Sequence, residues 1–295
     1  MISTFYLLSH SFQFPENISI RELENRIKDF SVDCEYIRKN DSDQIFIHDS
    51  VYEVEIFPNL STMDLMYDRS KNKDFDKDTL EYLRIIIEKS EQTILQEEEI
   101  KNLLPQHSEN QIFALLCLHK TNFAQEKYLV YNAHNWLVFH RYFLGIYPKN
   151  NIFFFSECKK YFPNLFFHER NQQTISKILF DFAQKIVFHL ACLHDHFKEI
   201  RQNHKFLPDA LKTFSITYKL DEQASLEGDL NRKKDLEFDF LNDEKKLEKI
   251  CCEPHLKLCR NDKDQDYFYY RIYFHEGKKN ISNGQILIGH IGEHL

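Results

Sequence analysis

The chain has 295 residues, of which 42% are apolar and 28% are charged, and it contains 27 Phe and 15 Tyr. This length suits one large domain or two ordinary ones, and the apolar content is enough for a folded core, which excludes global disorder. The net charge of −8 excludes the global basic excess of an unspecific nucleic-acid binder, and none of the six glycines falls in a G-x-G-x-x-G or G-x-x-x-x-G-K phosphate-loop pattern.

Residues 1–104 are predicted to form an N-terminal α+β domain with the element order β-α-β-β-β. Ser19 and Glu22 have the spacing of a capping box, and the apolar residues that follow repeat on one helical face. Apolar or alternating runs predict four strands, at 4–8, 34–38, 44–48 and 51–57. The second and third of these strands are expected to form a hairpin. Apolar residues at helical spacing between 79 and 104 predict another helix before Pro105.

Residues 105–205 are predicted to be a helical region. Ser108 and Gln111 again have capping-box spacing, which predicts a helix that ends near Leu118. Residues 135–144 predict a second helix, which Gly145 could end. Residues 174–201 contain the longest helical pattern of the chain.

Residues 206–295 are predicted to form a C-terminal antiparallel sheet domain. A strand is expected over 235–240 and one short helix over 242–250. Three further β-like runs, at 253–260, 267–276 and 285–291, are joined by short polar stretches, so an antiparallel meander is the simplest arrangement. The three regions together predict the α+β fold class.

The seven cysteines are an odd number, scattered through a large chain in which no signal peptide is visible. This pattern of cysteines predicts reduced thiols in a cytoplasmic protein, in preference to a disulfide framework. No stretch of about 18 uninterrupted apolar residues occurs, so no membrane association is expected.

The C-terminal meander carries the main candidate site. Strand alternation places His255 and Lys257 on one face of the first strand, and Arg271 and Tyr273 on the corresponding face of the second. Such a set can neutralise a phosphate, exchange a proton near neutral pH and donate a hydrogen bond. The alternative is a solvated polar face with no function beyond solubility.

Glycine is concentrated at the C-terminus, where four of the six glycines lie in the last nineteen residues. Gly289 and Gly292 interrupt a β-prone run, which predicts a bulge, a bend or a close approach of two backbones. His290 and His294 lie at this position, and His290 joins the candidate catalytic residues. The alternative is a packed terminal strand whose histidines are incidental.

Two groups of residues have partial metal-ligand character. His189, Cys192 and His196 share one helical face, but no fourth ligand can be assigned, so a core helix without metal is predicted. The second set consists of Cys251, Cys252, His255 and Cys259. It lacks the paired C-x-x-C knuckles of a strong zinc site, so whether it binds a metal stays open. Neither a metal nor a cofactor is predicted.

The residues Arg232, Lys233 and Lys234 form a short basic run within a stretch of nearly balanced charge. A solvated turn accounts for this run. If nucleic acid binds the meander, these three residues and Lys257 are the expected phosphate contacts.

The last sixty residues resemble the tail of a large set of uncharacterised bacterial proteins that occur near mobile elements and phage-defence genes. The resemblance rests on Glu253-Pro-His-Leu-Lys-Leu258, Arg271-Ile-Tyr-Phe274 and the ending Ile286-Leu-Ile-Gly-His-Ile-Gly-Glu-His-Leu295. The strand order also resembles, more distantly, the sheet of RelE/ParE-type toxins. That likeness implies a sheet whose basic and aromatic residues cut mRNA or contact a target.

These observations predict a bacterial phage-defence or toxin-type protein that acts on nucleic acid, RNA in preference to DNA, or on translation through its C-terminal sheet. A ribonuclease would use His255, Arg271, Tyr273 and His290. The alternatives are a non-catalytic component that binds a partner protein in a defence or toxin–antitoxin complex, and a sensor of a small phosphorylated ligand. Whether the protein is an enzyme is not decided by the sequence.

Overall fold

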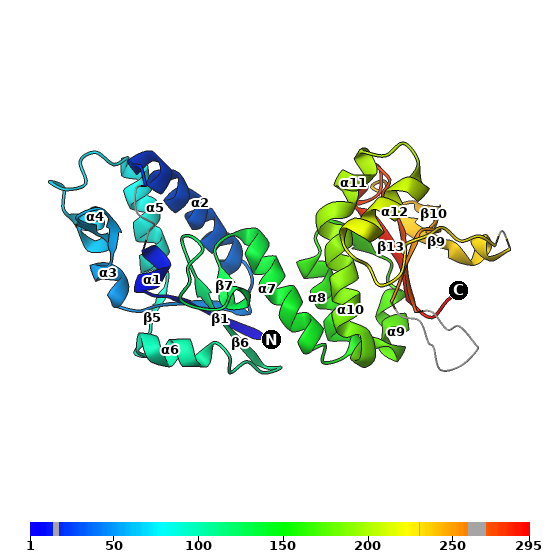
Figure 1. Ribbon diagram of the computed structural model, residues 1–295, viewed down its shortest axis with the longest axis horizontal. Coiled ribbons are helices and arrows are strands. Elements are labelled where there is room, and N and C mark those ends of the chain that lie inside the picture. Colours follow the sequence, from blue (N-terminus) through cyan, green and yellow to red (C-terminus); the bar gives the residue numbers. More distant parts are fainter. Residues whose placement is uncertain (14–17, 230, 259–269) are drawn as a thin grey trace. The chain divides into compact units, whose positions relative to one another are not determined.

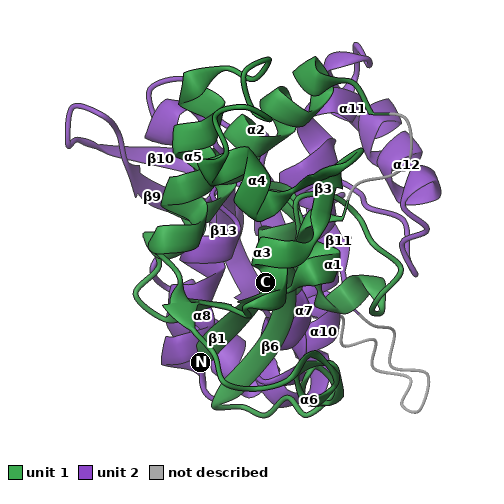
Figure 2. Ribbon diagram, turned by 90° about the vertical axis from the view of Figure 1, so that its left-hand side faces the viewer, with its two compact units in different colours: residues 1–140 green, residues 141–295 purple. Residues whose placement is uncertain are grey.

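The computed structural model describes residues 1–13, 18–229, 231–258 and 270–295. The chain divides into two compact units, unit 1 of Met1–His140 and unit 2 of Arg141–Leu295 (Figure 1, Figure 2). The boundaries expected after residues 104 and 205 differ from this division. Helices combine with parallel and antiparallel strands, and the predicted α+β fold class is confirmed.

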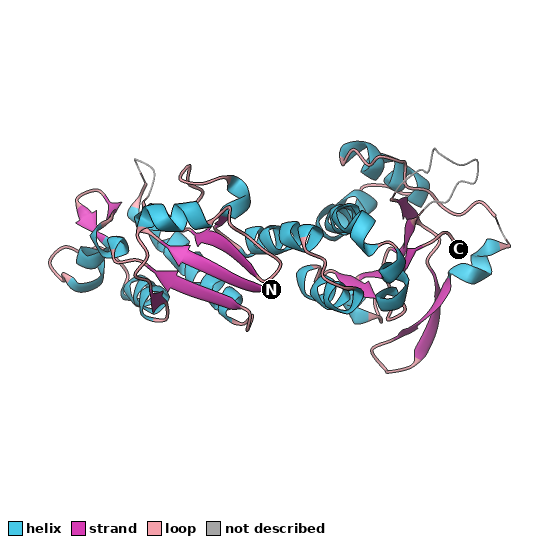
Figure 3. Ribbon diagram, turned by 90° about the horizontal axis from the view of Figure 1, so that it is seen from below, coloured by secondary structure: helices cyan, strands magenta, loops and turns pink. Residues whose placement is uncertain are grey.

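Unit 1 is organised around a five-stranded sheet in the order β5-β2-β1-β6-β7, in which every pairing is parallel (Figure 3). The strands are β1 (Ile2–Leu7), β2 (Asp43–Ile47), β5 (Glu91–Gln92), β6 (Gln111–Leu116) and β7 (Leu129–Val130). Strands β1 and β6 are buried from their second residue onward, as expected for a parallel sheet covered on both faces. A two-stranded antiparallel sheet, β3 (Glu55–Phe57) and β4 (Leu60–Ser61), lies apart from it.

Helices connect the strands of unit 1. The long helix begins as predicted, because Ser19 accepts a hydrogen bond from the Glu22 amide while the Glu22 carboxylate accepts one from the Ser19 amide. The helices are α1 (Ser9–Phe12), α2 (Ile20–Arg38), α3 (Ser50–Glu53), α4 (Thr62–Tyr67), α5 (Lys77–Glu88), α6 (Glu97–Leu103) and the 3₁₀ turn Glu126–Tyr128.

Three predictions for unit 1 are wrong. Residues 34–38 are the last turn of α2, so no hairpin precedes β2, which instead pairs with β1 in parallel. Residues 51–57 are divided between α3 and β3. The helix predicted from Ser108 is the central strand β6, because a strand buried on both faces has a continuous apolar run without alternation. Ser108 instead closes a turn, in which its amide donates to the Gln111 carbonyl at 2.8 Å.

The first part of unit 2 is helical, and the division between the units falls within α7 (Ala133–Ile146). The predicted helix over 174–201 is confirmed in outline, but Leu193–Phe197 forms a π-helix that interrupts it. The remaining helices are α8 (Asn151–Tyr161), α9 (Asn171–Thr174), the 3₁₀ turn Ile175–Lys177, α10 (Leu179–Cys192), α11 (Lys198–Gln202) and α12 (Leu207–Thr217).

The C-terminal meander is confirmed. The strands β11 (His255–Lys257), β12 (Arg271–His275) and β13 (Ile286–Gly292) pair antiparallel, and β8 (Leu165–Phe167) adds to β13 in parallel. The 3₁₀ turns Arg232–Leu236 and Ser282–Gly284 precede β9 and β13. The helix predicted over 242–250 is wrong, because β9 (Glu237–Leu241) and β10 (Leu247–Cys251) form an antiparallel hairpin.

Both faces of the meander are buried. On one face Phe274 packs against Phe197 of the π-helix, with ring centroids 5.1 Å apart. On the other face Tyr273 and Leu287 share an apolar cluster with the β9–β10 hairpin and the residues around it; the cluster also holds Leu236, Phe238, Phe240, Ile250, Cys252 and Ile281. Within the described ranges, no helix has the length and apolar character needed to cross a membrane.

Candidate functional site

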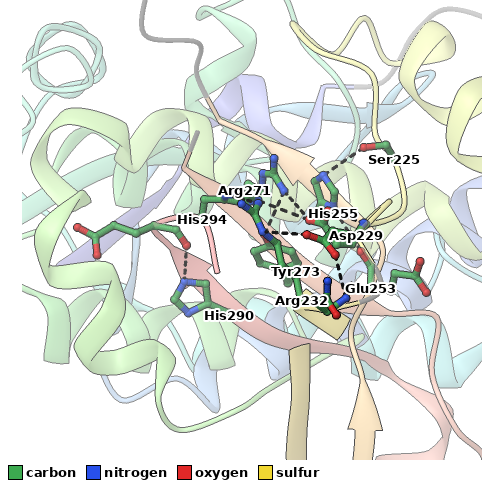
Figure 4. A network of polar contacts seen from close by, with 12 residues as sticks. Ser225, Asp229, Arg232, Glu253, His255, Arg271, Tyr273, His290 and His294 are labelled. Atoms are coloured by element: carbon green, nitrogen blue, oxygen red, sulfur yellow. Dashed lines mark hydrogen bonds and ion pairs between the residues drawn. The ribbon is translucent and has the colours of Figure 1, made fainter. Parts of the chain in front are cut away.

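The register of the meander brings together the residues predicted from the sequence. His255 lies opposite Tyr273, and Tyr273 lies opposite His290 on the next strand; Lys257 lies opposite Arg271. Directly paired residues of neighbouring strands point to the same face, so these five side chains share one face of the sheet. Figure 4 shows four of them, His255, Arg271, Tyr273 and His290.

This face is buried, so the alternative of a solvated polar face is wrong. Tyr273 is 0% exposed, His255 2%, His290 3% and Arg271 8%. The β9–β10 hairpin covers part of the face, and the segment 225–229 provides further contacts to it. Strand alternation identifies the shared face, but it carries no information about a segment from elsewhere in the chain that packs on it.

Arg271 forms a buried ion pair that the sequence analysis missed. Its Nη1 donates to Glu227 Oε2 and to the Tyr273 hydroxyl, both at 3.1 Å. His294 Nε2 lies 3.5 Å from the same Glu227 oxygen. Burial raises the pKa of Glu227, but the Asp229 amide, His294 and Arg271 outweigh it, and the pKa lies below its usual value. The guanidinium is therefore engaged by the protein's own carboxylate.

The two predicted proton-transfer histidines are held neutral. His255 donates from Nδ1 to the Glu253 carbonyl at 3.2 Å, and its Nε2 lies 3.1 Å from the Ser225 hydroxyl. His290 donates from Nε2 to the Glu293 carbonyl at 2.9 Å. Burial lowers the pKa of both imidazoles to about 4, and Arg271 contributes to the shift at His255. Without solvent access, this arrangement suits packing more than acid–base catalysis.

The expected irregularity at Gly289 is confirmed as a bulge. The β12–β13 register shifts between Tyr273 and Phe274, so Gly289 has no directly paired residue. A Cβ atom at Gly289 would lie 2.5 Å from Phe238 and 2.8 Å from the Cys252 sulfur. Glycine is therefore required here by the close approach of the β9–β10 hairpin.

The basic run forms the 3₁₀ turn Arg232–Leu236, and two of its cations are engaged. Arg232 lies 3.9 Å from Asp229 and 3.1 Å from His294, while Lys233 lies 3.0 Å from Glu253. Lys234 is exposed, and Lys257 is half-buried beside Arg271.

Neither metal-ligand set is assembled within the described residues, where no group of three or more His, Cys, Asp and Glu side chains could hold a metal ion. His189 is buried, and His196 stacks on Tyr218 with ring centroids 4.4 Å apart. The π-helix shifts the register between them, so the i, i+7 spacing no longer marks one face. Cys259 of the second set lies outside the described residues.

A basic pocket of about 470 Å³, which the sequence analysis missed, lies between α11 and the turn that joins β12 to β13. Lys198 and Arg201 share one face of α11, and Lys279 lies in the turn. Lys198 and Lys279 form no ion pair with any described residue, whereas Arg201 is paired with Glu276 at the pocket wall. The other lining residues are Phe197, Gln202, His204, Gly277, Asn283 and Gly284.

The walls of this pocket are ordered by local contacts. Arg201 Nη1 donates to the His204 carbonyl at 2.8 Å, and the His204 ring lies 2.9 Å from both the Ile200 carbonyl and the Thr213 hydroxyl. Gly277 has φ +108°, and a Cβ atom there would lie 2.5 Å from the Gly284 carbonyl oxygen. In the sequence, this pocket was signalled by its glycines and by the lysine pair at 278–279. Its other wall, α11, lies some eighty residues away in the chain, so the sequence did not show that the two come together.

The two units differ in charge. Unit 1 has 14 Lys and Arg against 24 Asp and Glu, a net charge of −10, whereas unit 2 has 24 against 22, a net charge of +2. The chain's negative charge therefore belongs to unit 1.

No protein-family model, curated protein or solved structure matches the chain.

Proposed function

We propose that unit 2 binds the phosphate backbone of single-stranded nucleic acid, RNA in preference to DNA, in the basic pocket between α11 and the β12–β13 turn. The observation that carries this proposal is the pair of lysines, Lys198 and Lys279, that flank the pocket without an ion-pair partner among the described residues. Cations that no carboxylate neutralises are the usual contacts for phosphate oxygens.

Two further features support nucleic acid as the ligand. Unit 2 has a positive net charge within a negative chain, which favours approach of a polyanion to this unit. Phe206 is exposed two residues after His204, next to Lys205, whose Nζ lies 5.5 Å from its ring centroid. An exposed aromatic ring beside phosphate contacts can stack on an unpaired base.

The proposed activity is binding and not cleavage. The two strand histidines are buried and neutral, and His204 at the pocket has both ring nitrogens within 2.9 Å of protein oxygens. No other described histidine lines this pocket. The resemblance of the C-terminal residues to defence-associated bacterial proteins is the reason for placing this binding in phage-defence or toxin biology.

The test compares charge reversals in fluorescence anisotropy titrations with a labelled single-stranded RNA and the matching DNA at several salt concentrations. Lys198→Glu combined with Lys279→Glu removes two phosphate contacts, so we expect affinity to fall at least about tenfold and the salt slope to decrease by about 1.4. Lys234→Glu, the matched control in the basic run, is expected to leave binding unchanged. Weakening by Lys234→Glu alone would place the nucleic acid on the basic run and refute the pocket.

The protein-binding alternative rests on one observation. Leu241 and Leu247 face each other at the end of the β9–β10 hairpin, and both are exposed. Two exposed leucines side by side form a small apolar surface that a partner protein could cover. Leu241→Asp with Leu247→Asp should then abolish phage protection in cells while RNA binding stays at the wild-type level.

A further inference from the structure

We propose that unit 1 contains a separate site for a free nucleotide that carries a polyphosphate, formed by α4, α5 and the loop between them. A cavity of about 710 Å³ lies here, within the usual size range of ligand sites, which is about 300–1,000 Å³. Its lining residues are Met66, Tyr67, Arg69, Asn72, Lys73, Phe75, Lys77, Leu80, Glu81 and Arg84. Both helices and the loop belong to unit 1 (Figure 2).

The cavity concentrates positive charge in the acidic unit. Four of the fourteen basic residues of unit 1 line it, together with one carboxylate, that of Glu81. Arg69, Lys73 and Lys77 are exposed and form no ion pair with the described part of the chain. A cavity with a local net charge of +3 in a unit of net charge −10 indicates a polyanionic ligand.

Three of the nearby acidic residues have partners of their own. Asp64 pairs with Lys71 at 2.8 Å, and Asp68 accepts hydrogen bonds from the Ser70 amide and hydroxyl. Asp76 caps α5 by accepting from the Asp78 amide. Asp74 and Asp78 follow Lys73 and Lys77 directly in the chain, but no carboxylate of the described residues lies within ion-pair distance of Arg69, Lys73 or Lys77.

An aromatic side chain and an anchored arginine stand beside the cations. Arg84 lies on the same face of α5 as Lys77, with its guanidinium carbon 5.7 Å from the centroid of the Tyr67 ring. Arg84 Nη2 donates to the Met66 carbonyl at 2.9 Å, and Nη1 lies 3.6 Å from Glu81, so the guanidinium is held in place before any ligand binds.

Tyr67 gives the site a surface for a planar ring. Its side chain is 54% exposed, although it lines the cavity and contacts Arg84. A base could stack on the phenol ring while its phosphates contact the loop and α5 cations. An aromatic platform beside several free cations favours a nucleotide over a sulfated or phosphorylated sugar, which has no aromatic ring to stack.

The experiment titrates the full chain with ATP, inorganic triphosphate and adenosine by isothermal calorimetry. We expect ATP to bind most tightly, triphosphate more weakly, and adenosine not at all below about 1 mM. Arg69→Glu and Lys73→Glu should each weaken ATP binding about tenfold or more, whereas Tyr67→Ala should weaken binding of ATP but not of triphosphate. Lys28→Glu, an exposed lysine of α2, is the matched control and should change neither.

Arg69 and Lys73 are exposed, so their variants should keep the thermal midpoint of the wild type, which is measured in parallel. Absence of ATP binding by the wild-type chain, or equal binding by Arg69→Glu and Lys28→Glu, would overturn the proposal. So would displacement of ATP by single-stranded RNA that depends on Arg69, because the cavity would then bind a nucleic-acid strand. Lys279→Glu should weaken RNA binding without affecting ATP, so this site and the unit 2 pocket can fail independently.

Discussion

Acid should unfold unit 2 well above the pH at which its carboxylates titrate, because three buried histidines are held neutral there. His189, His255 and His290 are each at most 3% exposed, and burial lowers the pKa of each imidazole from 6.5 to about 4. In the unfolded chain the same imidazoles take up protons as the pH falls through 6.5. Acid therefore favours the unfolded chain, and the loss of stability begins near pH 6.5 and is complete below about pH 4.

The size of the effect follows from these values. At pH 5 each histidine removes about 2 kcal/mol of folding free energy, or about 6 kcal/mol for the three together, which is comparable with the whole stability of an ordinary domain. The lowered pKa of Glu227 acts in the same direction, since its ion pair with Arg271 is lost as the pH falls through its folded pKa.

The assay is urea unfolding monitored by circular dichroism between pH 7.5 and 4.5, with hydrogen exchange to assign the transition to unit 2. His290→Gln removes one titrating group, so its stability should depend on pH less steeply than that of the wild type. His134→Gln changes an exposed histidine of unit 1 and should leave the dependence unchanged. Equal unfolding free energies at pH 7 and pH 5 for the wild-type chain would refute the reasoning.

Three further substitutions probe the packing in equilibrium unfolding. Arg271→Ala should lower the free energy of unfolding by about 3 kcal/mol, because it leaves the Glu227 carboxylate buried without its cation. A second change, Glu227→Gln, should restore part of this loss. An unchanged free energy of unfolding in Arg271→Ala would show that the ion pair is not structural. Gly289→Ala should lower the melting temperature by several degrees, since its Cβ would lie 2.5 Å from Phe238, and a neutral result would contradict the close packing of the hairpin. Ser19→Ala should lower the free energy of unfolding by about 1 kcal/mol, because it removes the cap of α2. A decrease below about 0.3 kcal/mol would indicate that the start of α2 frays in solution.

The sequence was sufficient where a local pattern decides the structure. The Ser19 capping box marks the start of α2, because its hydrogen bonds join residues three apart. The C-terminal meander follows from alternation and short polar connections, and Gly289 indicated the bulge because few other residues fit a close backbone approach. These features depend on neighbours along the chain, which the sequence displays directly.

Tertiary structure decided whatever depends on residues distant in the chain. Strand β6 reads as a helix because its second covered face removes the alternation that distinguishes a strand, and that cover is provided by other elements of unit 1. The histidine-bearing face of the meander was identified correctly as a face, yet the β9–β10 hairpin and Glu227 bury it. The pocket at Lys198 and Lys279 exists because folding brings α11 against a turn eighty residues further on. Periodicity specifies which side chains point the same way, whereas burial and site assembly are set by what packs against them.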